Sequence, residues 1–256
     1  ISGCVKTTKE EANNTTNQET LAQVSGQGTE QDTESSGTEA SSDDESQDAE
    51  VSRDLFAMDT YMTLTAYGEH AQEAVDKAAE RVGALAALLS TGDENSEIYQ
   101  LNQKGEATLS EDGGYLVERA LGLYDKTEGA FDIAIYPVMQ AWGFPTQEYH
   151  VPDDATLKEK LILADASKVN YDKDTRKISF DRDGMEIDLG GIAKGYTSAQ
   201  IMQIYQDCGV TSGLVNLGGN VQALGCKTDG SKWKVAIQSP DDTEDYLGIL
   251  EIENQA

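Results

Sequence analysis

The stretch IDLGGIAKGYTSAQIMQIYQDCG (residues 187–209) predicts a strand over Glu186–Leu189, two adjoining glycines, and a helix over Thr197–Cys208 that ends at Gly209. Glycines let a backbone approach a ligand closely, and the N–H groups at a helix start favour an anion. Lys194 could add positive charge for a phosphate, and Asp188 an acceptor for a ribose or ring N–H. The spacing is neither G-x-G-x-x-G nor a Walker A motif. The residues alone therefore leave two interpretations, a nucleotide-binding turn and a tight structural turn.

Outward from this stretch, apolar residues alternate between strand and helix periods. Helices are predicted at Ala71–Leu89 and Gly113–Thr127. Further strands are predicted at Asp59–Tyr67, Ile178–Phe180, Leu214–Leu217, Val221–Leu224, Trp233–Gln238 and Tyr246–Ile252. This order predicts a single α+β domain with a mainly antiparallel sheet and packed helices. The glycine turn Asn216–Asn220 is either a simple hairpin or a second wall of the same cleft.

Charge is unevenly spread along the 256 residues, whose net charge is -28. Residues 1–52 contain 12 acidic and two basic residues and no aromatic residue. Such a segment cannot bury enough apolar surface to fold, so we expect a disordered acidic linker before a folded domain at 53–256. The acidity argues against nucleic-acid binding, and no apolar run is long enough for a membrane-spanning helix.

The N-terminus Ile1-Ser2-Gly3-Cys4 has the form of a bacterial lipobox, in which the cysteine is lipidated after cleavage. We expect Cys4 to anchor an extracytoplasmic lipoprotein to the bacterial cell membrane, with the polar linker as its tether. The alternative is a chance cysteine in a disordered tail. Cys208 and Cys226 are expected to be core thiols.

A third cluster is Gly129–Ile133 (GAFDI), followed by Trp142-Gly143-Phe144. Asp132 could accept a hydrogen bond from a nucleobase or cap the turn. Trp142 and Phe144 are expected to anchor the core. His70 and His150 have no zinc-site spacing and are expected to be solvated.

Together these blocks resemble a known family, the FAD:protein FMN transferases, or ApbE-like flavin transferases. The similarity runs from about Phe56 to Pro240. Its blocks, in order, are FAMDT (56–60), SEIYQLN (96–102), GAFDI (129–133), WGF (142–144), IDLGGIAKGY (187–196), LVNLGGNVQALG (214–225) and WKVAIQSP (233–240). The resemblance implies an enzyme that uses Mg²⁺ to transfer FMN from FAD to a Thr or Ser hydroxyl of an acceptor protein, releasing AMP.

The resemblance also implies roles for individual residues. It places six residues around FAD and makes the main-chain carbonyl of Gly191 a magnesium ligand. The six are Met58, Ala130, Phe131, Asp132, Asp188 and Lys194. It supplies no catalytic residue inside the chain, because the family's His-containing segment and a metal-binding Asp/Thr pair are expected beyond Ala256.

The sequence departs from the family at Gly92, where an aromatic residue is usual, and at Ala199, where an Asp is frequent. The absent C-terminal blocks predict an incomplete transferase domain at 53–256 with impaired transfer activity. Two alternatives remain: an FAD-binding lipoprotein without transferase activity, and an acidic tethered binding protein with no flavin role.

Overall fold

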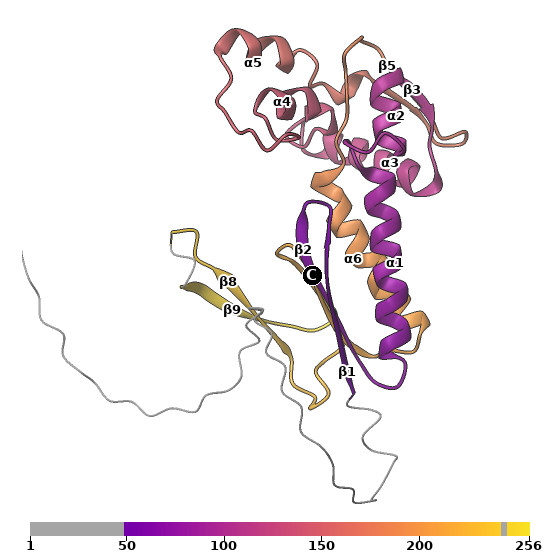
Figure 1. The fold of residues 1–256 in the computed structure, drawn as a ribbon, viewed down its shortest axis with the longest axis vertical. Helices are drawn as coiled ribbons and strands as arrows, with labels where there is room; N and C mark the ends of the chain where they lie inside the picture. The colour runs from indigo at the N-terminus through magenta and orange to yellow at the C-terminus, as the bar shows by residue number, and fades with distance from the viewer. Residues whose placement is uncertain (1–48, 242–244) are drawn as a thin grey trace, which may run out of the picture. The chain divides into compact units, whose positions relative to one another are not determined.

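The computed structural model describes residues 49–241 and 245–256. Cys4 and almost all of the predicted linker lie outside these residues. The described part has the predicted α+β fold with antiparallel sheets and packed helices (Figure 1). None of its helices is long and apolar enough to cross a membrane.

The larger sheet is antiparallel, with strand order β1-β2-β6-β7. Its strands are β1 (Glu50–Ala57), β2 (Thr60–Tyr67), β6 (Ser212–Leu217) and β7 (Asn220–Leu224). In β2, alternation places Met62, Leu64 and Ala66 on the buried face, as a half-buried strand requires. Met62 lies opposite Leu217 in β6, so the hydrophobic pattern and the register agree.

Helices α1 (Ala71–Leu89) and α6 (Gly190–Asp207) pack side by side against this sheet (Figure 1). The buried stripe of α1 and the α6 residues Ile201 and Tyr205 share one core with β2 and β6. A hairpin of β8 (Trp233–Gln238) and β9 (Tyr246–Ile252) forms a separate two-stranded sheet. Trp233 in this hairpin packs in a small cluster with Ala223 and Ile252.

The middle of the chain forms a second core around a small antiparallel sheet of order β3-β5-β4. Its strands are β3 (Glu106–Thr108), β4 (Val169–Asp172) and β5 (Lys177–Phe180). Its helices are α2 (Glu97–Lys104), α3 (Glu111–Lys126), α4 (Tyr136–Ala141) and α5 (Asp154–Leu161). Two short 3-10 helices also belong to this part of the chain, η1 (Ile133–Ile135) and η2 (Ala166–Lys168). Met58, at the β1–β2 turn, packs against both cores.

Several boundaries differ from the sequence-based expectation. Among the described residues, Glu186–Leu189 forms no strand and pairs with none, so the predicted strand there is wrong. Helix α6 begins at Gly190 rather than Thr197, and therefore contains both glycines and Lys194. Strand β1 begins at Glu50, so residues 50–52 pair with β2 and are not part of a linker.

Candidate functional site

A cleft of about 470 Å³ lies beside the start of α6. Four segments line it: the β1–β2 turn, the end of α1 with the following turn, α4 with the following loop, and the residues around the α6 N-terminus. The lining residues used below are Met58, Asp59, Gly92, Tyr136, Met139, Phe144, Pro145, Tyr149, Asp188, Gly190 and Lys194. The predicted site residues Met58, Asp188 and Lys194 therefore meet in one cavity.

The β1–β2 turn brings Met58 and Asp59 to the cleft in an unusual backbone conformation. Their φ angles are +49° and +57°, in the left-handed region. A two-residue hairpin turn of this kind favours Asn-Gly, and other residues are strained there. Such strain concentrates at functional sites, which agrees with the position of this turn on the cleft wall.

Two hydrogen bonds hold Asp188 in position. Its backbone N–H donates to the carbonyl of Ile133 at 2.9 Å, and its Oδ1 accepts from the Gly190 N–H at 2.8 Å. Burial raises the pKa of the Asp188 carboxyl. The hydrogen bond from Gly190 and the charge of Lys194 oppose this rise, whereas the charge of Asp59 adds to the rise. Asp188 is therefore a partly desolvated acceptor at the helix start.

Lys194 lies on the first turns of α6 and lines the same cleft. Among residues 49–241 and 245–256 its ammonium has no ion-pair partner within 4.0 Å, and it lies near enough to Asp188 to affect that carboxyl's pKa. Its three N–H donors are available to a ligand. A cation beside a helix N-terminus suits a phosphate.

The paired glycines lie close to two side chains. A Cβ on Gly190 would lie 2.9 Å from Asp188 Oδ1, and a Cβ on Gly191 would lie 3.1 Å from Cε2 of Phe131. A larger residue at 190 would therefore require the Asp188 carboxylate to shift. Phe131 thus packs beneath the first turn of α6 and supports it.

The Asp132 carboxylate accepts hydrogen bonds from the backbone. Its Oδ1 accepts from the Ala134 N–H at 2.7 Å and its Oδ2 from the Ala166 N–H at 3.1 Å. Both carboxylate oxygens are thus occupied by backbone donors, which favours the capping interpretation. Ala130, Phe131 and Asp132 are not among the residues lining the cleft, although Ile133 next to them holds Asp188. Their predicted contact with FAD stays a prediction.

Sequence reasoning missed Asn102 as a support of the site. Its side-chain amide donates to the Ile187 carbonyl at 2.9 Å and accepts from the Ile187 N–H at 2.8 Å. The Asn102 amide therefore satisfies both backbone polar groups of Ile187, which lies in none of the sheets of the described residues. The apolar alternation that suggested a strand here carried no information about this side-chain partner.

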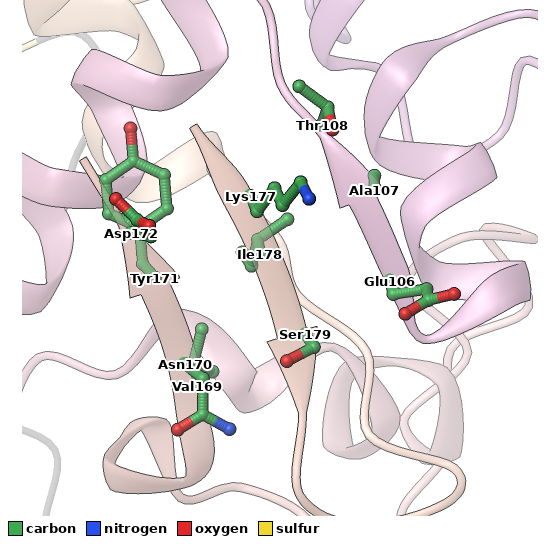
Figure 2. A pocket seen from close by; sticks show the side chains of 10 residues that line it. All are labelled: Glu106, Ala107, Thr108, Val169, Asn170, Tyr171, Asp172, Lys177, Ile178 and Ser179. Carbon is green, nitrogen blue, oxygen red and sulfur yellow. The ribbon is translucent and has the colours of Figure 1, made fainter. Parts of the chain in front are cut away.

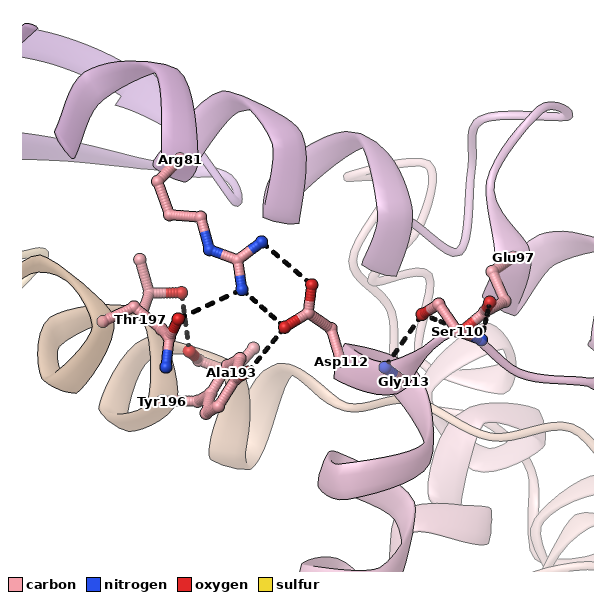
Figure 3. A network of polar contacts seen from close by, with 9 residues as sticks. Arg81, Glu97, Ser110, Asp112, Gly113, Ala193, Tyr196 and Thr197 are labelled. Atoms are coloured by element: carbon pink, nitrogen blue, oxygen red, sulfur yellow. Dashed lines mark hydrogen bonds and ion pairs between the residues drawn. The ribbon is translucent and has the colours of Figure 1, made fainter. Parts of the chain in front are cut away.

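A polar network fixes the other side of α6 (Figure 3). Arg81 of α1 donates to both carboxylate oxygens of Asp112, at 2.9 and 2.5 Å, and to the Gln200 side chain at 3.1 Å. The Tyr196 hydroxyl donates to Asp112 at 2.5 Å. Burial, followed by the bond to Asp112, raises the pKa of Tyr196 to about 12. The network connects α1, α3 and α6, and its residue Tyr196 follows Lys194 by two positions in α6.

A larger hollow of about 810 Å³ lies on the small sheet (Figure 2). Its lining comes from β3, β4 and β5 alone, with polar side chains such as Glu106, Asn170 and Lys177 along an open sheet face. Its lining includes no residue of the glycine motif (187–196) and no residue with a positive φ angle. We therefore assign the candidate site to the smaller cleft.

The second glycine turn does not reach that cleft. Gly218 and Gly219 form the β6–β7 hairpin turn, with the Gly219 N–H donating to Asn216 Oδ1 at 2.8 Å. Phe144 differs from its expected core position, because it is 52% exposed and lines the cleft. His70 and His150 are exposed, as expected. Cys208 and Cys226 are free thiols and are half-buried.

The cleft has only part of a metal site. Within residues 49–241 and 245–256, no three His, Cys, Asp or Glu side chains are grouped closely enough to hold an ion. Asp59 and Asp188 provide carboxylates on the cleft wall. Magnesium is commonly held by one or two carboxylates together with substrate phosphates, so this donor set fits in part. The Gly191 carbonyl lies in the first turn of α6, and its predicted role stays a prediction.

Comparison with known proteins agrees with this arrangement. The family model described as "ApbE family" matches residues 58–256. The FAD:protein FMN transferase of Treponema pallidum is 31% identical over 214 residues, covering 76% of this chain and 59% of the relative. The enzyme of the same name from Klebsiella pneumoniae is 30% identical over 173 residues, covering 66% of this chain and 53% of the relative. The chain thus spans between about half and three fifths of the length of these relatives.

Solved structures show the same fold. The ApbE protein of Thermotoga maritima superimposes with a TM-score of 0.76 at 23% identity, covering 81% of this chain and 68% of that one. The flavin transferase ApbE from Vibrio cholerae gives 0.73 at 22% identity, covering 80% and 69%. The family model covers well over half of the sequence and includes every cleft-lining residue named above. The chain belongs to the ApbE family.

Proposed function

We propose that this protein transfers FMN from FAD to a Thr or Ser hydroxyl of an acceptor protein, releasing AMP and a proton. The observation that carries the proposal is the position of Lys194. It is a cation beside Asp188 in the first turns of α6, in the cleft of an ApbE family member, and it has no ion-pair partner among the described residues. Relatives of the chain bear the name FAD:protein FMN transferase.

In this reaction the acceptor hydroxyl oxygen forms a bond to the FMN phosphorus, and the bond from that phosphorus to the AMP oxygen breaks. Phosphoryl-type transfer depends mainly on positioning and on stabilising charge. Lys194 would hold the phosphates, together with the Gly191 N–H in the first turn of α6. Asp188 would orient the nucleoside part through its buried acceptor oxygen.

We further propose magnesium as the metal of this reaction, by family resemblance and because the cleft carboxylates fit it in part. Asp59, Asp188 and the Gly191 carbonyl are the residues of this chain that would hold the ion. When bound, it would neutralise negative charge on the pyrophosphate. Removing it with EDTA should stop transfer, and added Mg²⁺ should restore it.

The decisive test offers FAD, Mg²⁺ and a Thr-containing acceptor protein to the whole gene product that carries this chain. Covalent flavin on the acceptor is followed by in-gel fluorescence. We expect labelling that requires the acceptor hydroxyl, so that a Thr→Ala acceptor is the control. FAD binding without labelling would support the alternative, an FAD-binding protein without transferase activity. Absence of FAD binding would contradict both.

The proposed setting is extracytoplasmic, with Cys4 as a lipid anchor in the bacterial cell membrane and an acceptor flavoprotein subunit as the partner. It rests on the lipobox-like Ile1–Cys4 sequence. Membrane fractionation of the whole gene product with Cys4→Ala tests it. Unchanged partitioning of the variant would show that Cys4 is not the anchor.

A further inference from the structure

Two aromatic rings stand exposed on the wall of the cleft, in the loop 142–150 that follows α4. Phe144 is 52% exposed and Tyr149 is 67% exposed, and both line the cavity. Their ring centroids are 5.5 Å apart at an interplanar angle of 72°, an edge-to-face pair. A scattered exposed aromatic residue is ordinary, but a contiguous pair beside a cavity indicates a binding surface.

The loop holds these rings in a fixed backbone. The Phe144 N–H donates to the Met139 carbonyl at 3.1 Å, and the His150 N–H closes the loop on the Trp142 carbonyl at 3.2 Å. Gly143 has a φ of +77°, and a Cβ there would lie 2.1 Å from the Glu148 carbonyl oxygen. The tight closure limits the conformational freedom that a ligand would otherwise have to remove.

The surroundings of the pair suit a flat, polarisable ligand. Met139 and Pro145 continue the apolar wall. Gly92 leaves space in the lining, because a Cβ there would meet nothing closer than 4.0 Å. Lys194 lines the same cleft. One cavity therefore offers a cation for a phosphate and aromatic surface for a ring.

We propose that Phe144 and Tyr149 bind a planar heteroaromatic ring of the ligand, the isoalloxazine or the adenine of FAD. This inference rests on the proposed function and extends its site. Aromatic side chains stack on nucleobases and similar rings through their π faces and tolerate different ring chemistries. The pair would thus hold one of the two ring systems of the dinucleotide at the loop.

The test uses the whole gene product and three ligands: FAD, riboflavin and AMP. The Phe144→Leu/Tyr149→Leu variant keeps apolar side chains but removes both rings, and Tyr149→Phe keeps the ring and removes only the hydroxyl. We expect FAD affinity to fall about five- to a hundredfold in the double variant, the usual range for losing a stacked ring. Tyr149→Phe should bind FAD as wild type does.

The other ligands identify the ring. A matching loss for riboflavin with AMP unaffected would place the isoalloxazine on the pair, and the reverse would place the adenine there. If wild type binds FAD and the double variant binds it equally well, the inference is wrong and the proposed function stands. If wild type binds none of the three, the proposed function fails and the inference fails with it. Because both side chains are exposed, circular dichroism should show that the double variant folds.

Discussion

At the scale of single residues, the proposed phosphate site depends on Lys194, which has no ion-pair partner within residues 49–241 and 245–256. Lys194→Ala should weaken FAD binding by about 1–3 kcal/mol, the range for losing a charged hydrogen-bond partner. Isothermal titration without added metal measures this loss. Lys158→Ala, in α5 and outside the lining of the cleft, is the matched control. Equal affinity of a folded Lys194 variant would remove this residue from the phosphate site.

Asp188 should give the site a pH-dependent effect on stability. Because burial raises its pKa in the folded state, the folded protein holds this proton at pH values where the unfolded chain has lost it. Folding stability from this group is therefore lost as pH rises from about 3.9, the ordinary Asp pKa, through the higher folded pKa. Above that pKa the loss is complete and constant.

Asp188→Asn removes this titration while keeping an acceptor for the Gly190 N–H. We expect the melting temperature of the variant, relative to wild type, to rise across that pH window and then to level off. Differential scanning calorimetry from pH 3.5 to 8 measures the difference. A difference that stays the same at every pH would show that the Asp188 charge is not desolvated in the folded protein.

At the scale of elements, the segment before α6 (Glu186–Leu189) depends on a side chain from α2. Asn102→Ala would leave the Ile187 N–H and carbonyl without their partners, and Ile187 is fully buried. Each unsatisfied buried group costs about 1–3 kcal/mol. We expect a loss of about 2–4 kcal/mol in the free energy of unfolding, measured by urea denaturation, together with weaker FAD binding.

The control for this effect is Gln103→Ala, the next residue on the same helix, which is exposed. It should change the free energy of unfolding by no more than about 0.5 kcal/mol. If Asn102→Ala were equally mild, the amide would not be holding the segment.

The contact between α1, α3 and α6 gives a second prediction at this scale. Asp112→Asn removes the charge that Arg81 and Tyr196 share, in an ion pair whose side chains are 27% and 21% exposed. We expect a loss of about 1–2 kcal/mol in unfolding free energy. The exposed pair Arg53–Asp76 supplies the control, since Asp76→Asn should cost about 0.5 kcal/mol or less. Equal effects of the two variants would contradict the network's role.

Elements with a clear hydrophobic period could be predicted from the sequence. Helix α1 and strands β8 and β9 have the predicted bounds. In α1 the buried apolar spacing runs from Ala71 to Leu89, the two ends of the helix. The start of α6 was missed because Gly190 and Gly191 resemble a turn, although both lie in that helix, close to the side chains of Asp188 and Phe131. Short helices such as α5 bury no residue and therefore have no apolar stripe to detect.

The site could be predicted only in part, for a related reason. Met58, Asp188 and Lys194 lie within recognisable sequence motifs, and all three line the cleft. Asn102 and Arg81 act through partners far away in the sequence, and a local pattern gives no distance between such positions. Tyr149 pairs with the nearby Phe144, but local spacing does not show that this pair lines the cleft. Phe144 was expected in the core because aromatic residues usually are buried, and its exposure follows from the loop that closes behind it.

At the scale of the whole molecule, the net charge of -28 opposes the approach of an anionic substrate. The proposed substrate, FAD, carries its negative charge on the pyrophosphate, so the long-range field of the protein would repel it while Lys194 would attract it only at short range. Salt screens interactions beyond about 10 Å at 0.1 M, and it affects the partly buried contact less. The rate of FAD association should therefore rise with ionic strength, contrary to the behaviour of a protein that attracts its ligand by charge.

Stopped-flow fluorescence at roughly 10 and 100 mM NaCl, with EDTA to exclude metal effects, measures this rate. We expect about a two- to tenfold increase for FAD, because electrostatic steering changes association rates on at least this scale. Riboflavin, which has no phosphate, is the matched control and should associate at the same rate in both salts. Slower association of FAD at higher salt would mean that a local positive field around Lys194 dominates the encounter, and that the acidic residues act too far from the cleft to oppose it.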